Sequence, residues 1–428
     1  MRRLFLSRYF HLLAALAIAL LTIIAYSNTF QASFHFDDHP QIIKNNNLKS
    51  INLNIIKETR GLTYLTFAVN YALGGLDVTG YHIVNTSVHI INSILAYWLL
   101  IATFGFIEKD DAWARRIAFF SALIFALHPI QTQAVTYIIQ RMESLSSLFY
   151  LSALLFFVKA AGSERPSKRV IFYALVGASY LLGFYSKETT FTLPAIIMLY
   201  DLYFVSRGSL KKLVLRWPLY GALAALFIFF TVNTIMPLGG FGDLSKESAV
   251  EVSSPTVDAS VPTMPREESA GFKVTYISPK EYLLTQFNVV VYYISLLAFP
   301  ANQNLDYDFP RATGLFKAPM PHKGAALNIP MLPPVLSLSI LLFILGLGLF
   351  LYFRSKGEAG GDRRLISFFI FWFFIILSPT SSLIPIIDVI YEHRLYLASL
   401  GFFTVFVILA DMLLRTAFRA KEAPSKVL

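Results

Sequence analysis

Residues 331–378 read MLPPVLSLSILLFILGLGLFLYFRSKGEAGGDRRLISFFIFWFFIILS, and this stretch decides the fold class. Its first run, 331–353, is long and apolar enough to cross a bilayer as a helix, and a second apolar run follows at 365–378. Between them lies Arg354–Arg364 (RSKGEAGGDRR), which is polar and basic, as is typical of a cytoplasmic turn between two spans. The stretch therefore predicts a helical hairpin in a membrane.

Similar apolar runs recur along all 428 residues, of which 56% are hydrophobic and 14% charged. Ten crossings are predicted, at about 9–26, 82–106, 112–128, 143–160, 170–186, 189–205, 217–236, 331–353, 365–378 and 395–414. The predicted fold is an all-α polytopic membrane protein, with one membrane domain over 1–414 and a basic cytoplasmic tail over 415–428. Because the chain has no cysteine, neither a disulfide framework nor a thiolate metal site is expected.

The net charge of +10 is distributed unevenly over the loops. Together with the two termini, the short loops on one side of the predicted bundle hold 22 of the 36 Lys and Arg residues. These loops are Glu108–Arg116, Lys159–Arg169, Ser206–Arg216 and Arg354–Arg364. The asymmetry identifies their side as cytoplasmic. Since it accounts for the excess positive charge, nucleic acid is not an expected partner.

Three segments can each be interpreted in more than one way. The basic residues 1–8 and the apolar run 9–26 predict a signal anchor with a cytoplasmic N-terminus, because the run is longer than that of a cleaved signal peptide. The Ser/Pro/Glu-rich stretch 237–280 predicts a flexible external loop. The segment Glu281–Phe299 is long enough to cross, but a crossing would put the basic linker outside. It is therefore expected to be a re-entrant or interfacial helix.

The first chemical candidate is the motif FHFDDHP after the first span, which holds Asp37 and Asp38. An aromatic, partly apolar setting raises the pKa of one carboxyl group of such a pair and makes it a candidate general base. A carboxylate pair also suits a hard divalent cation such as Mg²⁺ or Mn²⁺. The alternative is that one of the two caps the helix that follows.

Two external turns supply cations. The stretch HPIQTQAVTYIIQRMES holds His128, Arg141 and Glu143, and the turn YSKET holds Lys187 and Glu188. Arg141 is either a phosphate ligand or a structural partner of Glu143. Lys187 either binds the phosphate of a lipid carrier or extends to the headgroups.

The stretch IIDVIYEHRLYL before the last span adds Asp388, Glu392, His393 and Arg394. The planar guanidinium of Arg matches the geometry of phosphate oxygens. Arg394 and His393 are therefore predicted to bind a phosphate together, and Glu392 is predicted to orient Arg394. The alternative is an interfacial anchor made of Arg and Tyr. With Asp306 and Asp308, these residues place a base and several cations at one external face. An enzyme that uses a phospholipid-carried substrate needs that combination.

Six sequence motifs, in this order along the chain, resemble those of a known family. They are FDDHPQIIKNN, RGLTYLTFAVNYALGGLDVTGYHIVNTSVHIINSIL, ALHPIQTQAVTYIIQRMESLSSLFYLSAL, YSKETTFTLP, NLDYDFP and YEHRLYLASLGF. Over about 30–410 the chain resembles the membrane region of the transmembrane-and-tetratricopeptide-repeat O-mannosyltransferases and their bacterial relatives. These are GT-C glycosyltransferases, related to the protein O-mannosyltransferases.

The resemblance implies an inverting transferase that moves a hexose or pentose from a polyprenyl-phosphate donor to a hydroxyl, such as a Ser or Thr of an exported protein. Asp37 or Asp38 matches the family's acidic pair. Arg394, His393, Lys187 and Arg141 are then expected at the leaving phosphate, with Glu188, Glu392, Glu143, His128, Asp306 and Asp308 in support. The expected location is a bacterial inner membrane, with the site facing the periplasm.

Two departures from the family are visible. The chain has Gln131-Thr132-Gln133 where the family often has an acidic HTEAV-like segment, and residues 415–428 carry none of the family's repeats, so the acceptor is left open. Two rival functions stay open. One is a ligase or oligosaccharyltransferase that uses a diphosphate-linked glycan. The other is a non-enzymatic lipid transporter, which would place charges at mid-membrane in paired repeats rather than at one face.

Overall fold

The computed structural model describes residues 5–107, 110–235, 277–320, 331–355, 360–386 and 388–422. Within these ranges the chain is helical and contains no strand, so the predicted all-α class is confirmed. The predicted external loop 237–280 lies almost entirely outside the described residues, as does the end of the tail 415–428.

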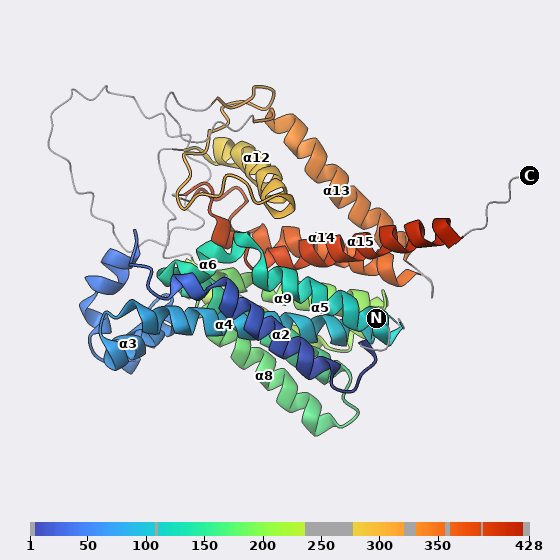
Figure 1. The fold of residues 1–428 in the computed structure, drawn as a ribbon, viewed down its shortest axis with the longest axis horizontal. Helices are drawn as coiled ribbons and strands as arrows, with labels where there is room; N and C mark the ends of the chain where they lie inside the picture. The colour runs from blue at the N-terminus through green and yellow to red at the C-terminus, as the bar shows by residue number, and fades with distance from the viewer. Residues whose placement is uncertain are drawn as a thin grey trace, which may run out of the picture.

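Every predicted span corresponds to a helix or to a helix extended by a π-helical turn (Figure 1). The helices are α2 (Phe10–Ala25), α4 (Val78–Phe104), α5 (Asp111–Leu127), α7 (Arg141–Ala161), α8 (Pro166–Phe184), α9 (Leu193–Tyr200) with η8 (Asp201–Val205), α11 (Trp217–Phe230) with η9 (Thr231–Ile235), α13 (Pro334–Arg354), α14 (Gly361–Leu377) and α15 (Ala398–Glu422).

By length and composition alone, fewer than ten of these helices qualify as membrane spans. Among the described residues, four helices are long and apolar enough: Val78–Phe104, Ile138–Ala161, Pro334–Arg354 and Ala398–Phe418. A fifth is added if Asp111–Leu127 and Pro129–Thr136, which are bent by 52°, form one broken span. The other helices are shorter or more polar, although several run alongside these in one bundle (Figure 1). Ten crossings therefore stay a prediction.

Helix α12 (Pro279–Ala298) is not among the candidate spans. A capping box between Ser278 and Glu281 begins it. Its side chains hold the loop before α15: Gln286 Nε2 donates to Val389 O at 2.8 Å, and Tyr293 Oη donates to Tyr391 O at 2.8 Å. This arrangement fits the predicted re-entrant or interfacial element.

The two ends of the bundle differ in chemistry. At one end, which we call the loop end, the segments 27–60, 128–140, 185–192, 299–320 and 378–397 contact one another. Helix α3 (Gly61–Gly74) lies at this end, on the left of Figure 1. At the other, basic end, Arg115 donates to Phe5 O at 3.0 Å, and Arg116 pairs with Asp411 at 2.6 Å. The predicted sites all come from loop-end segments or from helix termini that border them.

Candidate active site

The buried member of the acidic pair is Asp38, of which 1% is exposed. Its two carboxylate oxygens accept hydrogen bonds from the backbone N–H of His35 at 3.0 Å and of Ile139 at 2.8 Å. Burial raises the pKa of Asp38 to about 6, and these two N–H groups oppose that effect. Asp38 thus ties its loop to η6 (Ile138–Gln140), and it makes no capping bond to the helical turn that follows.

Asp37 is only half-buried, and its backbone N–H donates to Tyr137 Oη at 2.9 Å. Its carboxylate lies near two groups of the loop before α15. Burial is the main cause of the raised pKa of Asp388 and of Tyr391, and the charges of Asp37 and Asp306 add to it. Asp37 is therefore the member of the pair that faces the rest of the candidate site.

The metal site predicted at Asp37 and Asp38 stays a prediction. Each oxygen of Asp38 already accepts one backbone N–H, and the side chain is buried. Across the described ranges, no three His, Asp or Glu side chains converge in a way that could hold an ion. Asp37, which is only half-buried, is the more accessible candidate ligand for Mg²⁺ or Mn²⁺.

Arg141 begins α7 and is fully buried. Its Nε and Nη1 donate to Asn85 Oδ1 and Asn70 Oδ1, each at 2.6 Å, and Nη2 donates to Tyr81 O at 3.1 Å. Its guanidinium also lies over the Phe67 ring, 4.4 Å from the centroid. Arg141 therefore joins α3, α4 and α7 through neutral acceptors. The structural pairing with Glu143 that the sequence allowed does not form.

Glu143 instead pairs with Lys187, whose Nζ lies 2.9 Å from Glu143 Oε2 and 3.3 Å from Gln140 Oε1. Burial lowers the pKa of Lys187, and Glu143 opposes that shift. Lys187 is 8% exposed, so it does not extend to the lipid headgroups. Its ammonium remains within the polar loops, as a phosphate ligand would require.

Glu188, the next residue, forms a second ion pair with Arg60, whose Nε and Nη2 reach both carboxylate oxygens at 3.0–3.1 Å. Burial would raise the pKa of Glu188, but Arg60 holds it below its ordinary value. Arg60 has φ of 62°, and a Cβ on Gly61 would lie 2.0 Å from Ile55 O. This close approach of the chain brings Arg60 to the 185–189 turn. Sequence reasoning did not select Arg60.

Glu392 does not orient Arg394, contrary to expectation. Its carboxylate accepts from Gln303 Nε2 at 2.6 Å, from Asn304 N at 2.8 Å and from Tyr307 Oη, so it fixes the 303–307 segment. Burial raises the pKa of Glu392, and these three donors oppose that rise. The sequence did not indicate Gln303 and Asn304 as its partners.

Arg394 is held by the backbone of its own loop. Its Nη2 donates to Asp388 O at 2.7 Å, and its Nη1 donates to Val389 O at 3.2 Å. Its neighbour His393 donates its backbone N–H to Gln133 Oε1 at 2.6 Å. After the end of α5, His128 Nδ1 accepts from the backbone N–H of Ile130 at 3.2 Å.

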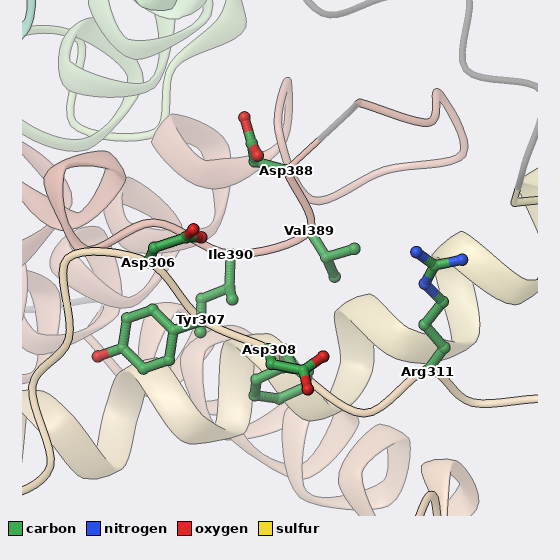
Figure 2. Close-up of a pocket in the computed structure, with 8 residues that line it drawn as sticks. Asp306, Tyr307, Asp308, Arg311, Asp388, Val389 and Ile390 are labelled. Carbon is green, nitrogen blue, oxygen red and sulfur yellow. The ribbon is translucent and has the colours of Figure 1, made fainter. Parts of the chain in front are cut away.

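A cavity of about 110 Å³ lies beside this loop (Figure 2). Asp306, Asp308 and Arg311 line it from one segment, and Asp388 lines it from the facing loop. Tyr307, Phe309, Val389 and Ile390 complete its wall. The expected supporting residues Asp306 and Asp308 are thus brought together with Asp388, next to Arg394 rather than next to Arg141.

Comparison with known proteins gives the site a family context. Residues 79–235 match the family described as dolichyl-phosphate-mannose-protein mannosyltransferase. This segment holds Gln133, Arg141, Glu143, Lys187 and Glu188, but neither Asp37 nor Arg394.

Three curated relatives are protein O-mannosyl-transferases. Tmtc3 of Drosophila melanogaster is 29% identical over 229 residues, which are 46% of this chain and 24% of the relative. TMTC3 of Mus musculus is 32% identical over 202 residues, 43% of this chain and 20% of the relative. TMTC2 of Homo sapiens is 30% identical over 225 residues, 47% of this chain and 26% of the relative.

The aligned part thus spans about a quarter of the length of these relatives. No solved structure matches the chain significantly. Residues 79–235 are therefore similar to the dolichyl-phosphate-mannose-protein mannosyltransferase family, and the chain is similar to the TMTC protein O-mannosyl-transferases over less than half of its length.

Proposed function

We propose that this chain is a GT-C glycosyltransferase that moves a sugar from a polyprenyl-phosphate donor to a hydroxyl group, a Ser or Thr of an exported protein. The observation that carries the proposal is the convergence at the loop end. Asp37, Lys187 and Arg394 lie 150 or more residues apart in sequence. Hydrogen bonds nevertheless tie their segments to residues 133–140: Asp37 N to Tyr137 Oη, Lys187 Nζ to Gln140 Oε1 and His393 N to Gln133 Oε1. The similarity to protein O-mannosyl-transferases supports the reaction class.

The reaction is a single displacement at the anomeric carbon. The acceptor oxygen forms the new C–O bond while the bond from that carbon to the phosphate oxygen breaks, so the configuration inverts. Asp37 takes the acceptor proton as general base, a role that typically contributes ~10²–10⁴-fold to the rate. The polyprenyl phosphate leaves with the electron pair of the broken bond.

The departing phosphate needs positive charge beside it. The charges of Lys187, Arg394 and Arg60 all act on His393, lowering its pKa, and a guanidinium binds phosphate oxygens in a planar fork. Because Lys187 is already paired with Glu143, its ammonium is held in place before the donor arrives. Preorganised cations of this kind stabilise charge that develops in the transition state.

The basic end supports an orientation for the site. If it faces the cytoplasm, the loop end faces the opposite side, which in a bacterial inner membrane is the periplasm. Acceptor proteins would then meet the enzyme after export, and the donor lipid would reach the loop end from within the bilayer.

The test is direct transfer by purified protein. The chain, in detergent or nanodiscs, is incubated with polyprenyl-phosphate mannose and a Ser/Thr-rich peptide, and the peptide mass is measured. The proposal predicts a gain of one hexose. If the protein transfers sugar only from a diphosphate-linked glycan, it is a ligase. If it moves the lipid across the membrane without transferring sugar, it is a transporter.

A further inference from the structure

Gln133, in α6 (Thr132–Thr136), joins two loops that are far apart in sequence. Its Nε2 donates to Leu305 O at 2.9 Å, and its Oε1 accepts from the backbone N–H of His393 at 2.6 Å. A backbone carbonyl only accepts and a backbone N–H only donates. These two partners therefore fix the orientation of the Gln133 amide.

The fixed amide determines which nitrogen of His393 carries the proton. Gln133 Oε1 also lies 3.1 Å from His393 Nδ1, and an amide oxygen only accepts, so Nδ1 is the protonated nitrogen. In the neutral ring, Nε2 then keeps its lone pair. The ring also stacks on Tyr391, with 5.0 Å between centroids. Among the described residues, Nε2 has no hydrogen-bond partner.

The surrounding charges keep this ring neutral. Burial, together with Lys187, Arg394 and Arg60, holds the pKa of His393 well below its ordinary value. The carboxylates of Glu143 and Glu188 are engaged by Lys187 and Arg60, and that of the adjacent Glu392 is engaged by the 303–307 segment. A neutral ring suits a hydrogen-bond acceptor rather than the phosphate-binding cation that the sequence predicted.

We propose that Nε2 of His393 accepts a hydrogen bond from a hydroxyl of the donor sugar, and that Gln133 sets the tautomer that makes this possible. The proposal rests on the proposed function, because it requires a lipid-phosphate sugar beside Lys187 and Arg394. An acceptor nitrogen among cations suits a ligand that presents hydroxyl donors next to phosphate oxygens. In this role His393 transfers no proton and selects for the sugar.

A pair of variants tests the contact without relying on turnover. His393→Asn keeps an amide that can reach Gln133 but removes the acceptor at Nε2, whereas His393→Gln extends its amide toward the Nε2 position. Equilibrium binding is measured with two probes, polyprenyl-phosphate mannose and polyprenyl phosphate without sugar. We expect His393→Asn to weaken binding of the mannosyl lipid about tenfold, as loss of one hydrogen bond does, and to leave the bare phosphate unaffected. His393→Gln should retain more affinity.

A third variant tests the role of Gln133. In Gln133→Glu a carboxylate faces Nδ1, which raises the pKa of His393 and favours a proton on Nε2. Affinity for the mannosyl lipid should then be lost at low pH and recovered as the pH rises through the raised pKa. The wild type should show no such step near neutral pH. A thermal melt of each variant confirms folding.

Nitrogen NMR of histidine-labelled protein reads the tautomer directly, whether or not the protein transfers sugar. A protonated Nδ1 with a bare Nε2 at neutral pH supports the inference, and a doubly protonated ring or a proton on Nε2 overturns it. The inference is also overturned if His393→Asn weakens binding of both probes equally, or if the wild type binds both probes with equal affinity. Failure of sugar transfer with these binding results intact would instead count against the proposed function alone.

Discussion

Asp37 and Asp38 are neighbours, but the chain uses them differently. Asp38 accepts two backbone N–H groups and is buried, whereas Asp37 keeps part of its surface exposed beside Asp388 and Tyr391. Phe36, just before them, has φ of 41°, a backbone region that non-glycine residues rarely adopt and that often marks functional sites. The division of roles between the two carboxylates predicts different outcomes for the same substitution.

Asp37→Asn should lower turnover by ~10²–10⁴-fold without loss of folding, because an amide cannot take the acceptor proton. Asp38→Asn is the matched control. Its NH₂ group must face the backbone N–H of His35 or Ile139, which costs about 1–3 kcal/mol and should appear as a lower melting temperature. Sugar transfer and thermal unfolding are measured for both. The assignment is wrong if Asp37→Asn turns over normally.

Arg394 presents a planar fork to two backbone carbonyls in the loop that borders the cavity. Arg394→Lys should weaken donor use markedly, because one ammonium cannot replace the fork, and Arg394→Ala should weaken it further, by about 2.7–4 kcal/mol. Turnover with polyprenyl-phosphate mannose is the measurement. Unchanged turnover in Arg394→Ala would make Arg394 an interfacial anchor and leave Lys187 and Arg60 as the phosphate ligands.

At the scale of elements, Arg141 holds the junction of α3, α4 and α7. Arg141→Lys should destabilise the protein, because Asn70 and Asn85 lose their shared donor at a cost of roughly 1–3 kcal/mol for each unsatisfied group. A lower melting temperature with unchanged donor affinity in the remaining folded protein is expected. If Arg141→Lys instead melts at the wild-type temperature but binds the donor phosphate more weakly, Arg141 is a phosphate ligand, as the sequence predicted.

The helices could be predicted from the sequence, but the contacts between them could not. Apolar runs of membrane length predicted the helices, because burial in lipid leaves a clear local signal. The partners of Glu188, Glu143 and Glu392 were missed or wrongly assigned, because each depends on how distant loops meet. Arg60 and Glu188 are 128 residues apart, and Gln133 and His393 are 260 apart. Nothing local in the sequence distinguishes Asp37 from Asp38, since the buried member is engaged by the N–H of Ile139, 101 residues away.

For the whole molecule, we expect one fixed orientation in the membrane. Reporter tags inserted in 237–280 should be accessible from outside the cytoplasm, and tags after Arg415 should be cytoplasmic. The basic loops motivate this expectation. If a tag in 237–280 is active in the cytoplasm, the loop end faces inward and the proposed meeting with exported acceptors is untenable.

If this chain glycosylates exported proteins with Asp37 as the base, its product should be visible on those proteins. We would compare, by mass spectrometry, exported proteins from cells that carry the wild-type chain, no chain, or Asp37→Asn. We expect a hexose or pentose on Ser or Thr residues in the first cells and its loss in the other two. Identical glycan masses in all three would contradict it.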